Sequence, residues 1–323
     1  MEYTTLGSTG VDVSRICLGC MSFGSSDWRP WVLEDDEALP IIERALDLGV
    51  NFFDTANMYS DGESERVLGE ALEGRWEDVF VATKCYFEVD GRRMSSGLSR
   101  KTIEQELDAS LERLGTDTVD LYQIHRWDYG TPVEETLRAL DDAVRRGKTR
   151  YVGASSMWAH QFAEALHTSD ELGLERFATM QNHYNAVYRE EEREMMPLCE
   201  REGVGVVPWS PLARGFLTRP HDEIDATERG ENEEYIYEHP YRDGGGREIN
   251  ERVEKIAEDE GLSMAQVGLA WVLSNDAVDA PIVGVTSVEH LEEAVEAVEA
   301  SLSESDIEYI EEPYEAVDVS GHG

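Results

Sequence analysis

Four residues in the first half of the chain have side chains that could together reduce a carbonyl group. Asp54 lies in NFFDTA, Tyr59 follows five residues later, Lys84 ends VFVATK and His125 ends LYQIH. A carbonyl group that accepts hydride develops negative charge on its oxygen, and a proton donor must then reach that oxygen. Tyr59 could be this donor, because a neighbouring ammonium such as Lys84 lowers a phenol pKa that is ordinarily about 10. Asp54 would keep Lys84 charged, and His125 would hydrogen-bond the carbonyl oxygen.

Each of these residues, taken alone, has a simpler explanation. An Asp before a helix is often a cap, a Lys at a strand end often reaches solvent on an apolar stem, and a single His is often structural. Their shared position is what favours chemistry. Asp54, Lys84 and His125 each lie at the end of an apolar run of strand type, and Tyr59 lies in the turn before an amphipathic helix expected at residues 64–72.

Apolar strand candidates alternate with amphipathic helices along almost the whole chain, which favours a parallel sheet covered by helices. Eight strands are predicted, at residues 16–21, 51–56, 79–84, 121–125, 151–156, 178–183, 204–210 and 281–285. Helices are predicted at 36–48, 64–72, 99–114, 132–146, 159–172, 190–202, 249–274 with a break near Gly261, and 288–300. This order predicts a single α/β domain over residues 1–323, a (β/α)8 TIM barrel whose catalytic side chains lie at the C-terminal ends of the strands.

Two regions fall outside the repeat. The opening YTTLGSTGVDVS alternates around a glycine turn and predicts a β-hairpin ahead of the first barrel strand. Residues 212–246 form a long loop after the seventh strand, on the face where the ligand-binding loops of a barrel gather, and we interpret the three glycines at 244–246 as a flexible linker. The competing architecture is a doubly wound dinucleotide-binding sheet, but the chain has no G-x-G-x-x-G motif.

The chain is strongly acidic. Its 69 Asp and Glu residues against 28 Lys and Arg residues give a formal net charge of -41, and the acids are spread along all 323 residues. Such a surface repels itself unless salt screens it, so we expect a halophilic protein of the cytoplasm. The alternative is an acidic face for a basic partner protein, which the dispersal of the charge disfavours. The sign of the charge disfavours nucleic acid.

Neither a membrane nor a metal is expected as a partner. No apolar stretch approaches the roughly 18 residues of a membrane span, and the N-terminus lacks the features of a secretory signal. The four cysteines, at 17, 20, 85 and 199, are too few for a disulfide framework. Cys17 and Cys20 form a C-x-x-C pair, but no second pair follows at zinc-site spacing, so we interpret them as small core residues.

The chain resembles the aldo-keto reductase family. The resemblance rests on FFDTANMY, VFVATK and DLYQIH, which carry the Asp, Tyr, Lys and His in the family's order, and it continues through LGSTGVDVSRICLGCMSFG, GASS, MQNHYN, PWSPLARGFLT and PIVGVTSVEHLEEA. It covers nearly the whole chain. It implies NAD(P)H-dependent reduction of an aldehyde or ketone, or the reverse oxidation of an alcohol. By the same resemblance Tyr59 is the proton donor, Lys84 and Asp54 tune it, and His125 orients the substrate.

The resemblance also implies how the nicotinamide and the phosphates are held. Trp209 would stack on the nicotinamide ring, and Ser155 and Gln181 would hydrogen-bond its carboxamide. Ser156 stands where many members have Asn. The pyrophosphate would lie along Ser210, Leu212 and Arg214.

The adenosine end of the cofactor would lie near the start of the last barrel helix, a favourable place for phosphate. The residues implied there are Gly284, Thr286, Ser287, His290 and Glu293. Members often have a basic residue where this chain has Thr286, and Asn where it has Ala294. A missing cation weakens recognition of the adenosine 2'-phosphate. We expect NADPH as the cofactor, with NADH as the alternative.

Two other functions are considered. A cofactor-sensing regulatory subunit, resembling the potassium channel beta subunits of the same family, would keep the site but would need a docking surface that the sequence does not show. A metal-dependent barrel hydrolase would need clustered ligands, but only His125 and His183 of the eight histidines fall near strand ends. Aromatic residues near strand ends predict an aromatic-lined pocket for a small carbonyl substrate: Trp28, Trp31, Tyr86, Trp127 and Trp158.

Overall fold

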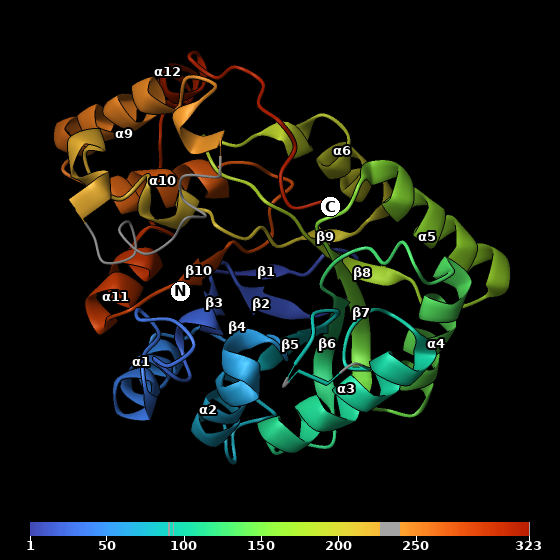
Figure 1. Ribbon diagram of the computed structural model, residues 1–323. Coiled ribbons are helices and arrows are strands. Elements are labelled where there is room, and N and C mark those ends of the chain that lie inside the picture. Colours follow the sequence, from blue (N-terminus) through green and yellow to red (C-terminus); the bar gives the residue numbers. More distant parts are fainter. Residues whose placement is uncertain (90, 93, 227–239, 323) are drawn as a thin grey trace.

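The computed structural model describes residues 1–89, 91–92, 94–226 and 240–322 (Figure 1). Within them, eight parallel strands form one curled sheet in the order β10-β3-β4-β5-β6-β7-β8-β9. The strands are β3 (Cys17–Gly19), β4 (Phe52–Asp54), β5 (Phe80–Cys85), β6 (Val119–Ile124), β7 (Thr149–Ser155), β8 (Phe177–Gln181), β9 (Gly205–Val206) and β10 (Ile282–Gly284). Parallel bridges from Val206 to Val278 and from Trp209 to Ile282 join the two ends of the sheet. The predicted (β/α)8 barrel is therefore confirmed.

Helices surround the sheet, as Figure 1 shows. They are α1 (Asp35–Asp47), α2 (Glu63–Ala71), α3 (Arg100–Leu114), α4 (Val133–Arg145), α5 (Ala159–Leu172), α6 (Met195–Glu202), α9 (Gly246–Glu260), α10 (Met264–Leu273), α11 (Val288–Glu296) and α12 (Glu304–Glu311). The predicted break near Gly261 is confirmed, because this glycine ends α9 with a φ of 68°. Each predicted helical range overlaps at least one of these helices.

One helix begins later than predicted, and another is missing from the prediction. The helix expected from residue 190 begins only at Met195, since Glu190–Glu192 form a 3-10 turn and Glu194 leaves the helical region with a φ of -138°. Helix α12 is not predicted at all. Its local signal is present, because Ser303 and Asp306 form a capping box in which the Ser303 hydroxyl accepts from the Asp306 N–H.

The predicted N-terminal hairpin is confirmed. It consists of β1 (Tyr3–Thr5) and β2 (Asp12–Ser14), paired antiparallel. The turn between them approaches the N-terminal ends of the barrel strands, where the Gly7 N–H donates to Asp279 Oδ2 at 2.8 Å. A Cβ at Gly7 would lie 2.4 Å from the Gly205 nitrogen, so this contact and a φ of 51° both require glycine. The hairpin therefore lies at the end of the barrel opposite to the strand ends that carry Asp54 and His125.

Side-chain alternation along the strands separates an inner core from an outer one. Phe52 and Leu121 belong to the inner cluster, whereas their neighbours Phe53 and Tyr122 pack outward against the helices. Residues two places further along face inward again. This period of two is why Asp54, which follows Phe52 by two positions, points into the barrel.

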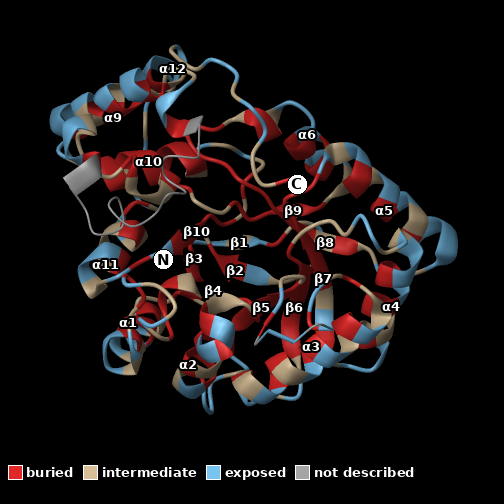
Figure 2. Ribbon diagram, in the orientation of Figure 1, coloured by how far each residue is buried: buried red, intermediate tan, exposed pale blue. Residues whose placement is uncertain are grey.

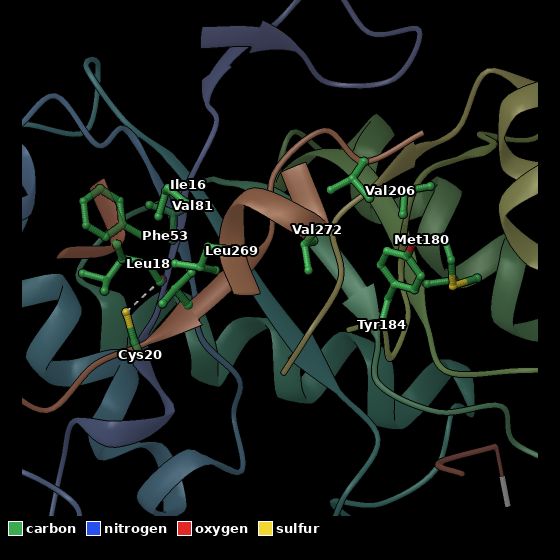
Figure 3. Packing of buried hydrophobic residues seen from close by; sticks show 14 of the residues in the cluster. Ile16, Leu18, Cys20, Phe53, Val81, Met180, Tyr184, Val206, Leu269 and Val272 are labelled. Atoms are coloured by element: carbon green, nitrogen blue, oxygen red, sulfur yellow. Dashed lines mark hydrogen bonds between the residues drawn. The ribbon is translucent and has the colours of Figure 1, made fainter. Parts of the chain in front are cut away.

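The outer core lies between the sheet and the helices. Figure 2 shows buried residues along the strands and on the sheet-facing sides of the helices, with exposed residues on their outer sides. In Figure 3, Leu269 and Val272 of α10 lie between a group of side chains from β3, β4 and β5 and a group from the β8 and β9 region. Cys20 belongs to this cluster and Cys17 to the inner one, and all four cysteines are buried and free, so the interpretation of the C-x-x-C pair as core residues is confirmed.

The segment after β9 is partly outside the described residues, which leave out 227–239. Its described parts contain the short 3-10 turns Ala213–Gly215, His221–Ala226 and Pro240–Arg242. The prediction of a flexible linker at residues 244–246 is wrong. Gly246 begins α9. A Cβ at Gly245 would lie 2.0 Å from the Pro313 carbonyl oxygen, and a Cβ at Gly246 would lie 1.7 Å from the Tyr241 carbonyl oxygen. These glycines allow the backbone to pack closely.

Candidate active site

Lys84 links Asp54, at the end of the neighbouring strand, to Tyr59 in the turn that follows that strand. Its Nζ donates to Asp54 Oδ1 at 2.6 Å, to the Thr55 carbonyl oxygen at 2.7 Å and to the Tyr59 hydroxyl at 3.3 Å. The Lys84 side chain has no exposed surface, and that of Asp54 is 3% exposed. An ion pair this deeply buried keeps its geometry, because each charge depends on the other for compensation.

Tyr59 is held in place by the turn that follows β4. Ser60, Asp61 and Gly62 all have positive φ, which turns the chain sharply before α2. The turn is fixed from both sides. The Asn57 amide donates to Glu106 Oε2 at 3.1 Å, and the Ser60 hydroxyl accepts from the Ser25 N–H at 3.1 Å. The phenol therefore reaches Lys84 from a constrained backbone.

His125 lies on the other side of Tyr59. Their rings meet edge to face, with 5.8 Å between centroids and 84° between planes. Burial is the main reason that the pKa of His125 lies well below its usual range, and the charges of Lys84 and Arg126 lower it further. The imidazole is therefore neutral at neutral pH and can donate a hydrogen bond to a carbonyl oxygen.

Lys84 lowers the pKa of Tyr59, as predicted, but the expected net fall in that pKa needs correction. Burial raises the pKa of Tyr59 and outweighs the opposing effect of the Lys84 ammonium, so the net shift is upward. Burial is the largest single influence on the pKa of Lys84 and lowers it, but the charges and hydrogen bonds of Asp54 and Tyr59 together outweigh burial and hold that pKa above its ordinary value. A protonated phenol beside a protonated amine results. This is the form from which Tyr59 can give a proton away.

Two amides complete the surroundings of Asp54. Gln123 Nε2 donates to Asp54 Oδ2 at 3.1 Å, and Gln181 Nε2 donates to the same oxygen at 2.8 Å. The sequence analysis does not identify Gln123. Its signal is its place two residues before His125, which directly follows β6, so that the alternation along the strand turns both side chains inward. Gln181, predicted to hold a carboxamide, directs its amide nitrogen to Asp54.

One cavity of about 900 Å³ joins the predicted catalytic and cofactor residues. Its lining includes Asp54, Tyr59 and His125, while Lys84 lies buried behind them. It also includes every predicted cofactor residue except Ser287: Ser155, Gln181, Trp209, Ser210, Leu212, Arg214, Gly284, Thr286, His290 and Glu293. Ser287 instead caps α11, where its hydroxyl accepts from the His290 N–H. The structure thus brings the two groups together at the C-terminal ends of the strands.

Trp209 lies in a stack of three rings. The His183 ring lies parallel to it with 4.0 Å between centroids and 8° between planes, and Tyr188 stacks on the far face of His183 at 4.0 Å and 15°. Trp209 Nε1 donates to Ser156 Oγ at 2.9 Å. Ser156 has a φ of 45°, a region that Asn enters more readily than Ser. One face of the indole is thus covered, and the ring is fixed at its edge.

The C-terminal tail runs back across the loop after β8 and ends beside this stack. The Val317 N–H donates to Glu190 Oε1 at 3.1 Å, and His322 Nε2 lies 2.9 Å from Glu191 Oε1. A Cβ at Gly321 would lie 3.4 Å from Trp209 Cζ2. The tail therefore lies against Trp209, which itself lines the cavity.

The aromatic lining differs from the prediction. Of the five aromatic residues expected there, Trp31 lines the cavity, together with Phe87, which the sequence analysis does not select. Trp127 lines a separate small pocket beside α4, and Trp158 is 40% exposed at the start of α5. Nearness to a strand end does not fix the direction in which a loop side chain points.

The described residues contain no cluster of three or more His, Cys, Asp or Glu side chains that could hold a metal ion. None of the described helices has the length and apolar character needed to cross a membrane.

A family model described as the aldo/keto reductase family matches residues 15–315. The chain belongs to the aldo-keto reductase family. It is therefore an oxidoreductase, of a family that uses NAD(P)H as a class and reduces carbonyl groups.

Fungal aldo-keto reductases are similar to the chain over almost its full length. Versiconal hemiacetal acetate reductase of Aspergillus parasiticus is 43% identical, with 97% of each chain covered. The aldo-keto reductase AFTS1 of Alternaria alternata is 42% identical, covering 99% of this chain and 93% of its own. A Schizosaccharomyces pombe protein named provisionally as an aryl-alcohol dehydrogenase is 42% identical, with 99% of this chain and 97% of that protein covered. These relatives are consistent with an oxidoreductase that acts on carbonyl compounds or alcohols.

Proposed function

We propose that this aldo-keto reductase reduces an aldehyde or ketone with Tyr59 as the proton donor and NADPH as the preferred cofactor. The bound cofactor supplies a hydride to the carbonyl carbon. Tyr59 gives its hydroxyl proton to the carbonyl oxygen, so that the substrate becomes an alcohol. Lys84 stabilises the phenolate that remains, Asp54 keeps Lys84 charged, and neutral His125 donates a hydrogen bond that orients the carbonyl.

The observation that carries this proposal is the position of the Lys84 ammonium between Asp54 and Tyr59. The ammonium lies 2.6 Å from the carboxylate and 3.3 Å from the phenol, and the phenol opens into the same cavity as His125. A phenol that loses its proton there leaves its negative charge next to the buried Lys84 ammonium, where the attraction is stronger than in bulk solvent.

The cavity also suits a nicotinamide dinucleotide. Trp209 lines the cavity and is held parallel to His183, and we place the nicotinamide ring against its indole there. Ser155 would reach the carboxamide, Ser210, Leu212 and Arg214 would lie along the pyrophosphate, and Gly284 and Glu293 would border the adenosine. For the 2'-phosphate of NADPH the donors would be Thr286 and His290, whose Oγ1 and Nδ1 lie 3.3 Å apart, with Ser287 at the start of α11.

We further propose that residues 1–323 form one domain, that the protein works in the cytoplasm and that it is adapted to salt. The four free cysteines are consistent with a reducing compartment. The net charge of -41 is consistent with a medium in which salt screens the acids.

Tyr59→Phe tests the central step. It should lower kcat for aldehyde reduction by at least about 100-fold, because a positioned proton donor contributes roughly 10² to 10⁴. Binding of NADPH, measured by titration calorimetry, should change little. Tyr86→Phe removes a phenol outside the cavity lining and is the matched control. Turnover by Tyr59→Phe within a few-fold of the wild type would remove Tyr59 as the donor.

A further inference from the structure

A cation lies one aromatic ring away from His125 in the cavity. Phe87 meets His125 edge to face, with 5.0 Å between ring centroids. The guanidinium carbon of Arg126 lies over the Phe87 ring, 5.6 Å from its centroid. Arg126 Nη1 donates to the carbonyl oxygen of His125 at 2.6 Å, and both Phe87 and Arg126 line the cavity. The guanidinium is therefore fixed relative to the imidazole that is proposed to orient the carbonyl.

The cofactor does not account for this cation. Arg126 lies just after β6, whereas the residues proposed for the nicotinamide, pyrophosphate and adenosine lie at the ends of β7, β8 and β10 or in the segments after β9 and β10. Figure 1 shows β6 and β10 well separated around the sheet. Arg214 and the start of α11 lie on the cofactor side of the cavity and are the groups proposed to meet its phosphates. Arg126 belongs to the half of the cavity that is left for the substrate.

Arg126 is positively charged, whereas the protein as a whole is strongly negative. A chain with a formal net charge of -41 creates a field that repels anions, so a substrate that carries a carboxylate needs a local cation in order to bind. The charge of Arg126 also affects the pKa values of His125 and Tyr59. Although burial is the main cause of the lowered pKa of His125, Arg126 contributes to it, and Arg126 is also one of the smaller effects that lower the pKa of Tyr59 against the dominant effect of burial.

We propose that the substrate is a flat, largely aromatic aldehyde that carries a carboxylate about one benzene ring away from its carbonyl group, and that Arg126 selects for this carboxylate. This inference rests on the proposed function, since it places the carbonyl oxygen between Tyr59 and His125. Phe87 and Trp31 would line the path of the aromatic ring. A guanidinium suits the far end, because it offers parallel N–H donors to the two oxygens of a carboxylate.

The test compares two aldehydes that differ in charge and little in size, terephthalaldehydic acid and its methyl ester. With NADPH and the wild-type protein at fixed salt, kcat/KM should be at least tenfold higher for the acid. The difference should lie mainly in KM, because Arg126 would bind the carboxylate equally well before and during the reaction. In Arg126→Gln the ratio of the two kcat/KM values should fall to about one. Arg126→Lys should keep part of the preference, since it keeps the charge and loses the planar fork.

Arg145→Gln is the matched control. It removes the same charge from the outer side of α4, where the Arg145 side chain is 65% exposed, and it should leave the ratio as in the wild type. A readout independent of turnover is competition by terephthalate, which should weaken at least tenfold in Arg126→Gln. If Arg126→Gln fails to fold by circular dichroism, the wild-type ratio and Arg126→Lys still decide the question.

The outcomes separate the two proposals. Reduction of both aldehydes with equal efficiency, or better reduction of the ester, would overturn the inference and leave carbonyl reduction standing. A preference for the acid that survives Arg126→Gln would overturn the role of Arg126. If neither these aldehydes nor a broad panel of neutral aldehydes is reduced, the proposed function falls and this inference falls with it.

Discussion

Replacing Lys84 by Met should separate the stabilising role of the Lys84–Asp54 pair from its role in the reaction. Methionine keeps most of the volume of the lysine stem and removes the ammonium, which leaves the carboxylate of Asp54 without its partner at 2.6 Å. Breaking a buried ion pair from one side costs about 3–5 kcal/mol. Gln123 and Gln181 still donate to the other carboxylate oxygen, so the carboxylate keeps two of its hydrogen bonds.

The loss of folding stability in Lys84→Met has an upper limit that depends on pH. A carboxylate that has lost its partner can take up a proton, which costs about 1.4 kcal/mol for each pH unit above the ordinary aspartic acid pKa of about 3.9. The charge penalty is therefore at most about 4 kcal/mol at pH 7 and about 1.5 kcal/mol at pH 5. In the folded variant the protonated form is favoured relative to the unfolded chain. The loss of stability relative to the wild type should accordingly shrink as pH falls.

The double variant Lys84→Met/Asp54→Asn removes both charges and tests this explanation. Denaturant unfolding at fixed salt should show a loss of about 3–4 kcal/mol for the single variant at pH 7 and of less than about 2 kcal/mol for the double one. Both should lose at least about 100-fold in kcat, because neither can stabilise a phenolate at Tyr59. A double variant as unstable as the single one, or one that regains activity, would refute the reasoning.

Trp209→Ala should raise the Kd for NADPH by about tenfold, or roughly 1.4 kcal/mol, because it removes the ring stacking. Trp158→Ala, at an exposed site, should leave the Kd unchanged. Titration calorimetry checks both variants, and an unchanged Kd in Trp209→Ala would count against stacking. Lowering KCl from about 1 M to 0.1 M extends the screening length from roughly 3 Å to 10 Å and should lower the melting temperature measured by circular dichroism. An equal melting temperature at both salt concentrations would contradict salt adaptation.

Most of the barrel could be predicted because its signals are local. The eight apolar runs, including the one that leads to Asp54, are bounded by polar turns and separated by helical periodicity, and the period of two along a strand already fixes which side chains face inward. The same reasoning brings Asp54, Lys84 and His125 to one end of the barrel. Residue type and strand position suffice for this part of the site.

The remaining features depend on contacts between segments far apart in the chain. The stack of Tyr188 and His183 behind Trp209 joins two loops, and the donation from Gln181 to Asp54 spans 127 positions. Whether the pKa of Tyr59 rises or falls depends on whether the effect of burial or that of the Lys84 charge is larger, and this comparison requires the packed site. The close approach of Gly245 to Pro313 likewise depends on the path of the C-terminal tail.

The position of that tail bears on how the protein can be handled. A purification tag or fluorescent reporter attached to the C-terminal tail would disturb the segment in which His322 contacts Glu191 and Gly321 lies beside Trp209. The β1–β2 hairpin lies at the opposite end of the barrel. Fusions for purification, immobilisation or imaging therefore belong at the N-terminus, and a C-terminal fusion that slows turnover would report on the tail and say nothing about the chemistry.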